Sequence, residues 1–154
     1  MKSKLLIVAL TFTVIAACKK DQFTTKPQLK FISTSSTVFV TGQEMIFDME
    51  FTDKEGDINK GSMYFEEVTK DTLCPDNNAV NKGHYTISPD FINTVNSSGT
   101  ISIRYTYGTT DGQYPIYSGP QCGRNDTCFL RFALTDEANN TSDTIVSPQL
   151  VFIK

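Results

Sequence analysis

The sequence predicts an all-β fold, an antiparallel sandwich of two sheets with about seven strands. Hydrophobic residues recur at every second position along most of the chain, which is the period of a half-buried strand. Gly, Asn and Asp residues separate these runs at the spacing of turns in an all-β domain. Strands with one apolar face must bury those faces against each other, so we expect two packed sheets.

Three windows carry the strongest strand signal. In residues 45–51, MIFDMEF, Met and Phe share one face while the acidic residues share the other. In residues 100–108, TISIRYTYG, Ile and Tyr alternate with Ser, Arg and Thr. In residues 128–136, CFLRFALTD, Cys128 has the same phase as Leu130 and Phe132. The shorter candidate strands are LKFIS (29–33), TVFVT (37–41), SMYFEEVT (62–69), YTI (85–87), DTIVS (143–147) and QLVFIK (149–154).

The N-terminus has the layout of a secretory signal peptide. Lys2 and Lys4 precede the uncharged run LLIVALTFTVIAA, residues 5–17, which ends on small residues. A helix that spans a bilayer needs about 20 apolar residues, so this run is too short for a permanent transmembrane anchor. We therefore expect export of the chain.

Residues 15–18, Ile-Ala-Ala-Cys, resemble the lipobox of bacterial lipoproteins. The resemblance implies that residues 1–17 are a lipoprotein signal peptide and that Cys18 receives diacylglycerol. Several acyl chains would then hold a water-soluble domain stably at a membrane. Lys19, in place of Asp, implies the outer membrane, with a periplasmic or surface-facing domain. An ordinary signal peptide followed by a chance cysteine is the alternative.

The predicted organisation is therefore a signal peptide (1–17), a lipidated tether (18–28) and one sandwich domain (29–154).

The chain has a net charge of −3 at pH 7, and removal of the signal peptide would make it more acidic. Nucleic-acid binding needs a basic face, so we expect no nucleic-acid partner. The predicted partners are the membrane, through the lipid, and an envelope protein or a glycan.

Two further segments resemble Ig-like and cadherin-like modules of bacterial surface lipoproteins. FTDKEGDI, residues 51–58, is similar to their strand end and acidic turn, and LTDEANNTSDTIVSPQLVFI, residues 134–153, is similar to their closing hairpin. The resemblance implies an Ig-like sandwich. The chain has no Trp, so the tryptophan typical of antibody domains is missing.

The acidic turn is the best candidate for a metal site. Asp53, Glu55 and Asp57 offer the hard oxygen ligands that Ca²⁺ prefers. The glycine spacing excludes an EF-hand. A carboxylate from another loop, for instance Asp111 or Asp136, would have to complete the site. The alternative is a solvated turn, and we expect no cofactor other than Ca²⁺.

The cysteines predict one disulfide. With Cys18 used for the lipid, three remain in an oxidising compartment: Cys74, Cys122 and Cys128. Cys122 and Cys128 flank a short loop and are the preferred pair, although Cys74 can also pair with either.

Enzyme signatures are missing from the sequence. There is one histidine, and there is no nucleophile elbow, phosphate-binding glycine loop or zinc-protease motif.

A long Tyr-rich connection, residues 107–126, offers Tyr114 and Tyr117 to a glycan or a protein partner. The expected function is a lipid-anchored, non-enzymatic interaction or accessory module, and a glycan-binding lipoprotein is the alternative.

Overall fold

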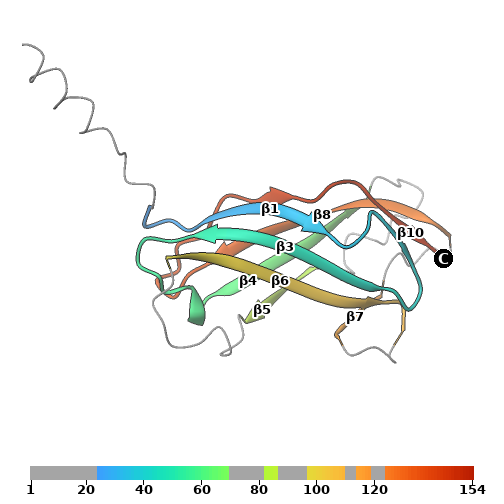
Figure 1. The fold of residues 1–154 in the computed structure, drawn as a ribbon, viewed down its shortest axis with the longest axis horizontal. Coiled ribbons are helices and arrows are strands. Elements are labelled where there is room, and N and C mark those ends of the chain that lie inside the picture. Colours follow the sequence, from blue (N-terminus) through green and yellow to red (C-terminus); the bar gives the residue numbers. More distant parts are fainter. Residues whose placement is uncertain (1–23, 70–81, 87–96, 110–113, 119–123) are drawn as a thin grey trace, which may run out of the picture.

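A computed structural model describes residues 24–69, 82–86, 97–109, 114–118 and 124–154. These residues form the predicted all-β sandwich of two sheets (Figure 1). None of them lies in a helix with the length and hydrophobicity needed to span a bilayer. The elements are β1 (Gln28–Thr34), β2 (Val38–Val40), β3 (Glu44–Thr52), the 3-10 helix η1 (Ile58–Lys60), β4 (Ser62–Thr69), β5 (Lys82–Thr86), β6 (Ser98–Tyr107), β7 (Ile116–Tyr117), β8 (Asp126–Thr135), β9 (Ile145–Val146) and β10 (Leu150–Ile153). The predictions for Cys18, Cys74, Asp111 and Cys122 fall outside the described residues.

The strand order is that of an Ig-like sandwich. The first sheet has the order β1-β3-β6-β7, and the second has the order β2-β10-β8-β4-β5, with β9 also paired to β8. As in Ig domains, β3 and β6, the second and fifth long strands, are neighbours in one sheet. β8, which pairs with the last strand β10, is central in the other sheet.

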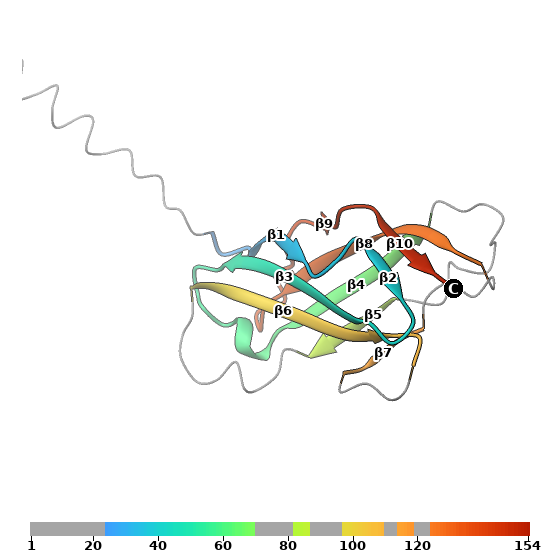
Figure 2. The same cartoon turned by 45° about the vertical axis from the view of Figure 1, so that its right-hand side comes forward.

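Two edge pairings are parallel, which differs from the predicted antiparallel arrangement. β2 runs parallel to β10, and β7 runs parallel to β6. Residues 35–37 carry the chain from β1 in one sheet to β2 in the other without a hairpin reversal (Figure 2). The pairing of β2 with β10 is therefore set by this crossover.

The core lies between the sheets and is rich in Phe, Tyr and Met. The alternation predicted for residues 45–51 is confirmed, since Met45, Phe47, Met49 and Phe51 each have an exposed fraction of 0%. The same holds in β8 for Cys128, Leu130 and Phe132. Phe152 of β10 packs against Tyr107 and Tyr117 of the first sheet, with ring centroids 5.0 and 5.1 Å apart. Aromatic contacts of this kind add to the stability gained by burial.

Two buried serines attach the C-terminal segment to β8. Ser142 donates its N–H to the Leu134 carbonyl at 2.8 Å, and its Oγ accepts the Leu134 N–H at 2.9 Å. Ser147 forms the same pair of bonds with Leu130, at 2.8 and 3.0 Å. Each serine thus satisfies both backbone groups of the residue opposite, as a regular strand pair would. These hydrogen bonds hold the segment after the turn that follows β8 against that strand.

Candidate functional site

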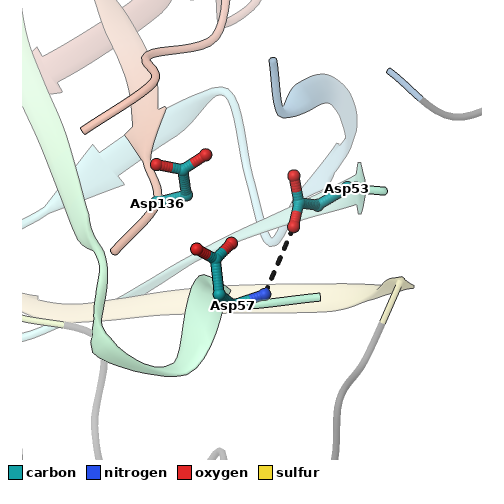
Figure 3. A group of neighbouring side chains, drawn as sticks. All are labelled: Asp53, Asp57 and Asp136. Atoms are coloured by element: carbon teal, nitrogen blue, oxygen red, sulfur yellow. Dashed lines mark hydrogen bonds between the residues drawn. The ribbon is translucent and has the colours of Figure 1, made fainter. Parts of the chain in front are cut away.

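Three aspartates from separate segments meet at one end of the sandwich (Figure 3). Asp53 directly follows β3, Asp57 directly precedes η1, and Asp136 directly follows β8. One carboxylate oxygen of each lies within 4.8 Å of those of the other two. Because β3 and β8 belong to different sheets, the cluster connects both layers of the fold.

The approach of these segments depends on a close backbone contact. Ser62, the first residue of β4, pairs with Thr135, the last residue of β8. Gly61 precedes this pair, and a Cβ built on it would lie 2.0 Å from the Thr135 carbonyl oxygen. Only glycine leaves room for that carbonyl. The contact holds the connection that carries Asp57 against the strand end that carries Asp136.

The cluster lies at the end of the domain where the described chain begins. The Lys54 N–H, inside the acidic turn, donates a hydrogen bond to the Thr24 carbonyl at 3.2 Å. Figure 1 shows β1 starting at this end, whereas β7 lies at the opposite end. The acidic turn is therefore next to the segment through which the domain is joined to its N-terminus.

Asp53 is the innermost member of the cluster, with an exposed fraction of 0%. Its Oδ2 accepts hydrogen bonds from the N–H groups of Gly56, at 2.6 Å, and Asp57, at 3.3 Å. Gly56 has a φ of +69°, a value that favours glycine, so the turn wraps tightly around this carboxylate. Asp53 Oδ1 is buried and has no hydrogen-bond partner.

Burial raises the pKa of Asp53 above its ordinary value. The two backbone N–H donors oppose this effect because they stabilise the ionised form, and the neighbouring Asp57 carboxyl raises the pKa further. The ionised cluster is therefore costly when no positive charge is present.

Asp136 is also buried, with an exposed fraction of 3%. Its Oδ1 accepts the Asn140 N–H at 2.7 Å, and its Oδ2 accepts the Asn140 side-chain amide at 2.9 Å. Asn139 completes this turn with a φ of +67°, which Asn tolerates better than most residues. The Asn-rich turn therefore orients the Asp136 carboxylate.

The predicted metal ligands are brought together only in part. Asp53 and Asp57 meet as expected, and Asp136 joins them from the other sheet. Glu55 departs from the prediction, because its side chain is exposed at the tip of the turn and it is not among the carboxylates that meet. The sequence signal for Asp136 is an aspartate at a strand end followed by an Asn-rich turn.

Tyr117 is not available as a ligand-binding residue, and the prediction that it lies free was wrong. Tyr117 lies in β7 and pairs with Tyr107 of β6. Its ring is buried, with an exposed fraction of 1%. Burial, together with the neighbouring Cys128 and Glu67, raises its pKa well above the ordinary value. Tyr114 is half-buried, and its Oη accepts a hydrogen bond from Arg104 Nη1 at 3.1 Å. A flat platform of two tyrosines is thus not formed.

Cys128 is a free thiol in the structure, which contradicts the predicted bridge to Cys122. Its side chain points into the core with an exposed fraction of 0%, in phase with Leu130. Mainly because the thiol is buried, its pKa is raised well above the usual value. The thiol therefore stays protonated.

Comparisons with known proteins assign no family. No protein-family model matches the chain, and no curated protein matches it. Among solved structures, Spo0M, a sporulation control protein from Bacillus subtilis, is similar at 12% sequence identity with a TM-score of 0.41. That match covers 84% of this chain and 50% of the other, so the chain spans about half the length of Spo0M.

Proposed function

We propose that the protein is a lipid-anchored, non-enzymatic module of the bacterial cell envelope that interacts with another envelope protein. The observation that carries this proposal is the N-terminal sequence, in which a positive start and an apolar run end in Ile-Ala-Ala-Cys at Cys18. An Ig-like sandwich follows after a short tether. This arrangement suits a module held near a membrane by lipid alone.

The position of the tether supports an interaction role for the opposite end of the sandwich. The described chain begins beside the acidic turn, so a lipid at Cys18 would leave the other end free to face away from the membrane (Figure 1). Val38 and Val40 of the edge strand β2 have exposed fractions of 47% and 51%. Exposed apolar side chains on one short strand are a suitable contact for a protein partner.

The backbone of β2 favours contact through side chains. The Val38 N–H donates to Ser36 Oγ at 3.0 Å, and the Val40 N–H donates to Gln43 Oε1 at 3.2 Å. The carbonyls of the same valines accept from Ser36 Oγ, at 2.7 Å, and from the Gln43 N–H, at 3.0 Å. Because these groups are already bonded, a partner strand gains little by pairing with them.

The anchor is tested by labelling cells with a radioactive or clickable fatty acid. The natural chain is expected to carry the label and to sediment with envelopes, whereas Cys18→Ser is expected to lose both properties. Equal attachment of the Cys18→Ser chain would overturn the proposal.

The interaction is tested by photocrosslinking in intact envelopes, followed by mass spectrometry. Probes at Val38 and Val40 are expected to capture the same envelope protein, and Val38→Asp is expected to abolish capture. Val146 is the matched control, because it is an equally exposed valine, at 50%, in the separate strand β9. Capture that survives Val38→Asp would place the interface elsewhere.

A further inference from the structure

The aspartate cluster contains buried oxygen atoms that nothing in the described chain satisfies. Asp53 Oδ1 and Asp57 Oδ1 are both buried and lack a hydrogen-bond partner. Figure 3 shows both carboxylates projecting into the space beside Asp136. A buried carboxylate oxygen without a partner costs free energy, because it has lost its water and gained nothing in return. Two such atoms in one cluster make it a candidate site for a positively charged ligand.

No lysine or arginine of the described residues forms a salt bridge with the cluster. The nearby Lys60 ammonium pairs with Glu137 at 2.8 Å. Asp57 is the N-cap residue of η1, yet its side chain makes no capping hydrogen bond. Its carboxylate is therefore free to bind something else.

We propose that Asp53, Asp57 and Asp136 bind a Ca²⁺ ion that holds the two sheets together. Ca²⁺ binds oxygen ligands at about 2.3–2.6 Å, so ligands on opposite sides of the ion lie roughly 4.6–5.2 Å apart. The three oxygens lie within 4.8 Å of one another, so one ion can contact all three. Mg²⁺ requires a near-ideal octahedron and usually keeps several waters with one or two carboxylates, whereas Ca²⁺ accepts more oxygen ligands in a flexible geometry, so three carboxylates favour Ca²⁺.

The surroundings hold these ligands in position. Backbone N–H groups bind the other oxygen of Asp53, and Asn140 binds both oxygens of Asp136 through one lone pair each. Such outer contacts orient carboxylates toward a metal. Asp57 is only half-buried, which leaves room for water molecules to complete the six to eight ligands of Ca²⁺.

The ion would stabilise the domain where it joins the tether. It would cross-link the turn between β3 and η1 to the end of β8, which lies far away in sequence. A ligand that binds only the folded state raises the free energy of unfolding in proportion to the logarithm of its concentration. This inference does not depend on lipidation or on a protein partner.

The test uses the full chain in detergent, stripped with EGTA, with calcium chloride as the probe. Calorimetry is expected to show binding of one Ca²⁺, and 1 mM Ca²⁺ is expected to raise Tm by roughly 5 °C or more. Mg²⁺ at the same concentration is expected to give less than half of that shift. Absence of both binding and a Tm shift would overturn the proposal, and an equal response to Mg²⁺ would overturn the assignment to Ca²⁺.

Variants locate the site. Asp57→Asn and Asp136→Asn are each expected to lose the Ca²⁺-dependent Tm shift. Glu55→Gln is the matched control, an exposed carboxylate in the same turn, and is expected to keep the shift. Asp57 is half-buried, so its variant is expected to fold even if an Asp136 variant does not. A full shift in Asp57→Asn would overturn the proposal.

Discussion

The Tyr117 hydroxyl donates a hydrogen bond to Glu67 Oε2 at 2.5 Å, and this bond joins β7 of the first sheet to β4 of the second. The Tyr117 ring also stacks on Phe152 of β10, with centroids 5.1 Å apart. A polar contact between sheets thus lies near each end of the sandwich. At the end where the described chain begins it is a cluster of carboxylates, and at the opposite end it is a complete hydrogen bond.

Tyr117→Phe is expected to lower the free energy of unfolding by about 1–3 kcal/mol, because the ring remains and only the hydroxyl is lost. Urea unfolding measures this change. Tyr64→Phe is the control, since the Tyr64 hydroxyl makes no hydrogen bond among the described residues. A loss no larger than that of the control would mean that the bond to Glu67 contributes nothing to stability.

Gly61→Ala is expected to destabilise the fold by about 2 kcal/mol or more, because the added Cβ must displace the Thr135 carbonyl. Gly61 has a φ of −78°, which any residue adopts, so the effect is purely steric. The displacement would also separate Asp57 from Asp136 and weaken the Ca²⁺ response. Thermal unfolding with Ca²⁺ and with EGTA measures both effects. Ser62→Ala, the adjacent change, is expected to keep the response, and a normal response in Gly61→Ala would contradict the account.

The fold was predictable because the sequence of each long strand alternates between hydrophobic and polar residues. The alternation in residues 45–51 and 128–134 requires one buried face in each strand, and two such faces suffice to predict a sandwich. Tyr117 was misjudged because β7 has only two residues, too few for a period. The inward orientation of Tyr117 comes from its pairing with Tyr107.

The proposed Ca²⁺ ligands likewise depend partly on local sequence and partly on strand register. Asp53 and Asp57 are neighbours in sequence, so their meeting was predictable. Asp136 joins them only because Ser62 pairs with Thr135, and no local pattern reveals the register of two strands so far apart. Glu55 has the right chemistry, but its place at the tip of the turn turns it toward solvent.

In EGTA the natural chain is expected to gain stability relative to Asp53→Asn as the pH falls from neutral through the raised pKa of folded Asp53 toward the ordinary value of 3.8. In that window the folded state binds the Asp53 proton more tightly than the unfolded state does, so stability rises as the pH falls. Denaturant unfolding across a pH series measures the slope. Asp53→Asn serves as the reference, since the difference between the two chains isolates this group. Parallel slopes would contradict the effect.

Cys128 is expected to react with a thiol reagent only when the protein unfolds. Its Sγ is inaccessible, and burial keeps the thiol protonated at neutral pH. A chain with Cys18→Ser, Cys74→Ser and Cys122→Ser reports this thiol alone in a reaction with Ellman's reagent. Labelling is expected to be absent in buffer and complete in guanidinium. Rapid labelling of the folded chain would show that the core around β8 opens.

Ser36→Ala combined with Gln43→Ala is expected to promote self-association. The Ser36 side chain bonds the N–H and carbonyl of Val38, and the Gln43 side chain bonds the Val40 N–H, so their removal exposes two donors and one acceptor on the edge strand β2. An uncovered edge with exposed valines is a template for pairing with a second chain. Sedimentation velocity in detergent measures the change. Ser33→Ala is the control, because Ser33 bonds to Asp48 in the first sheet, away from β2. If the double variant sediments like the control, the edge is protected by something other than these two side chains.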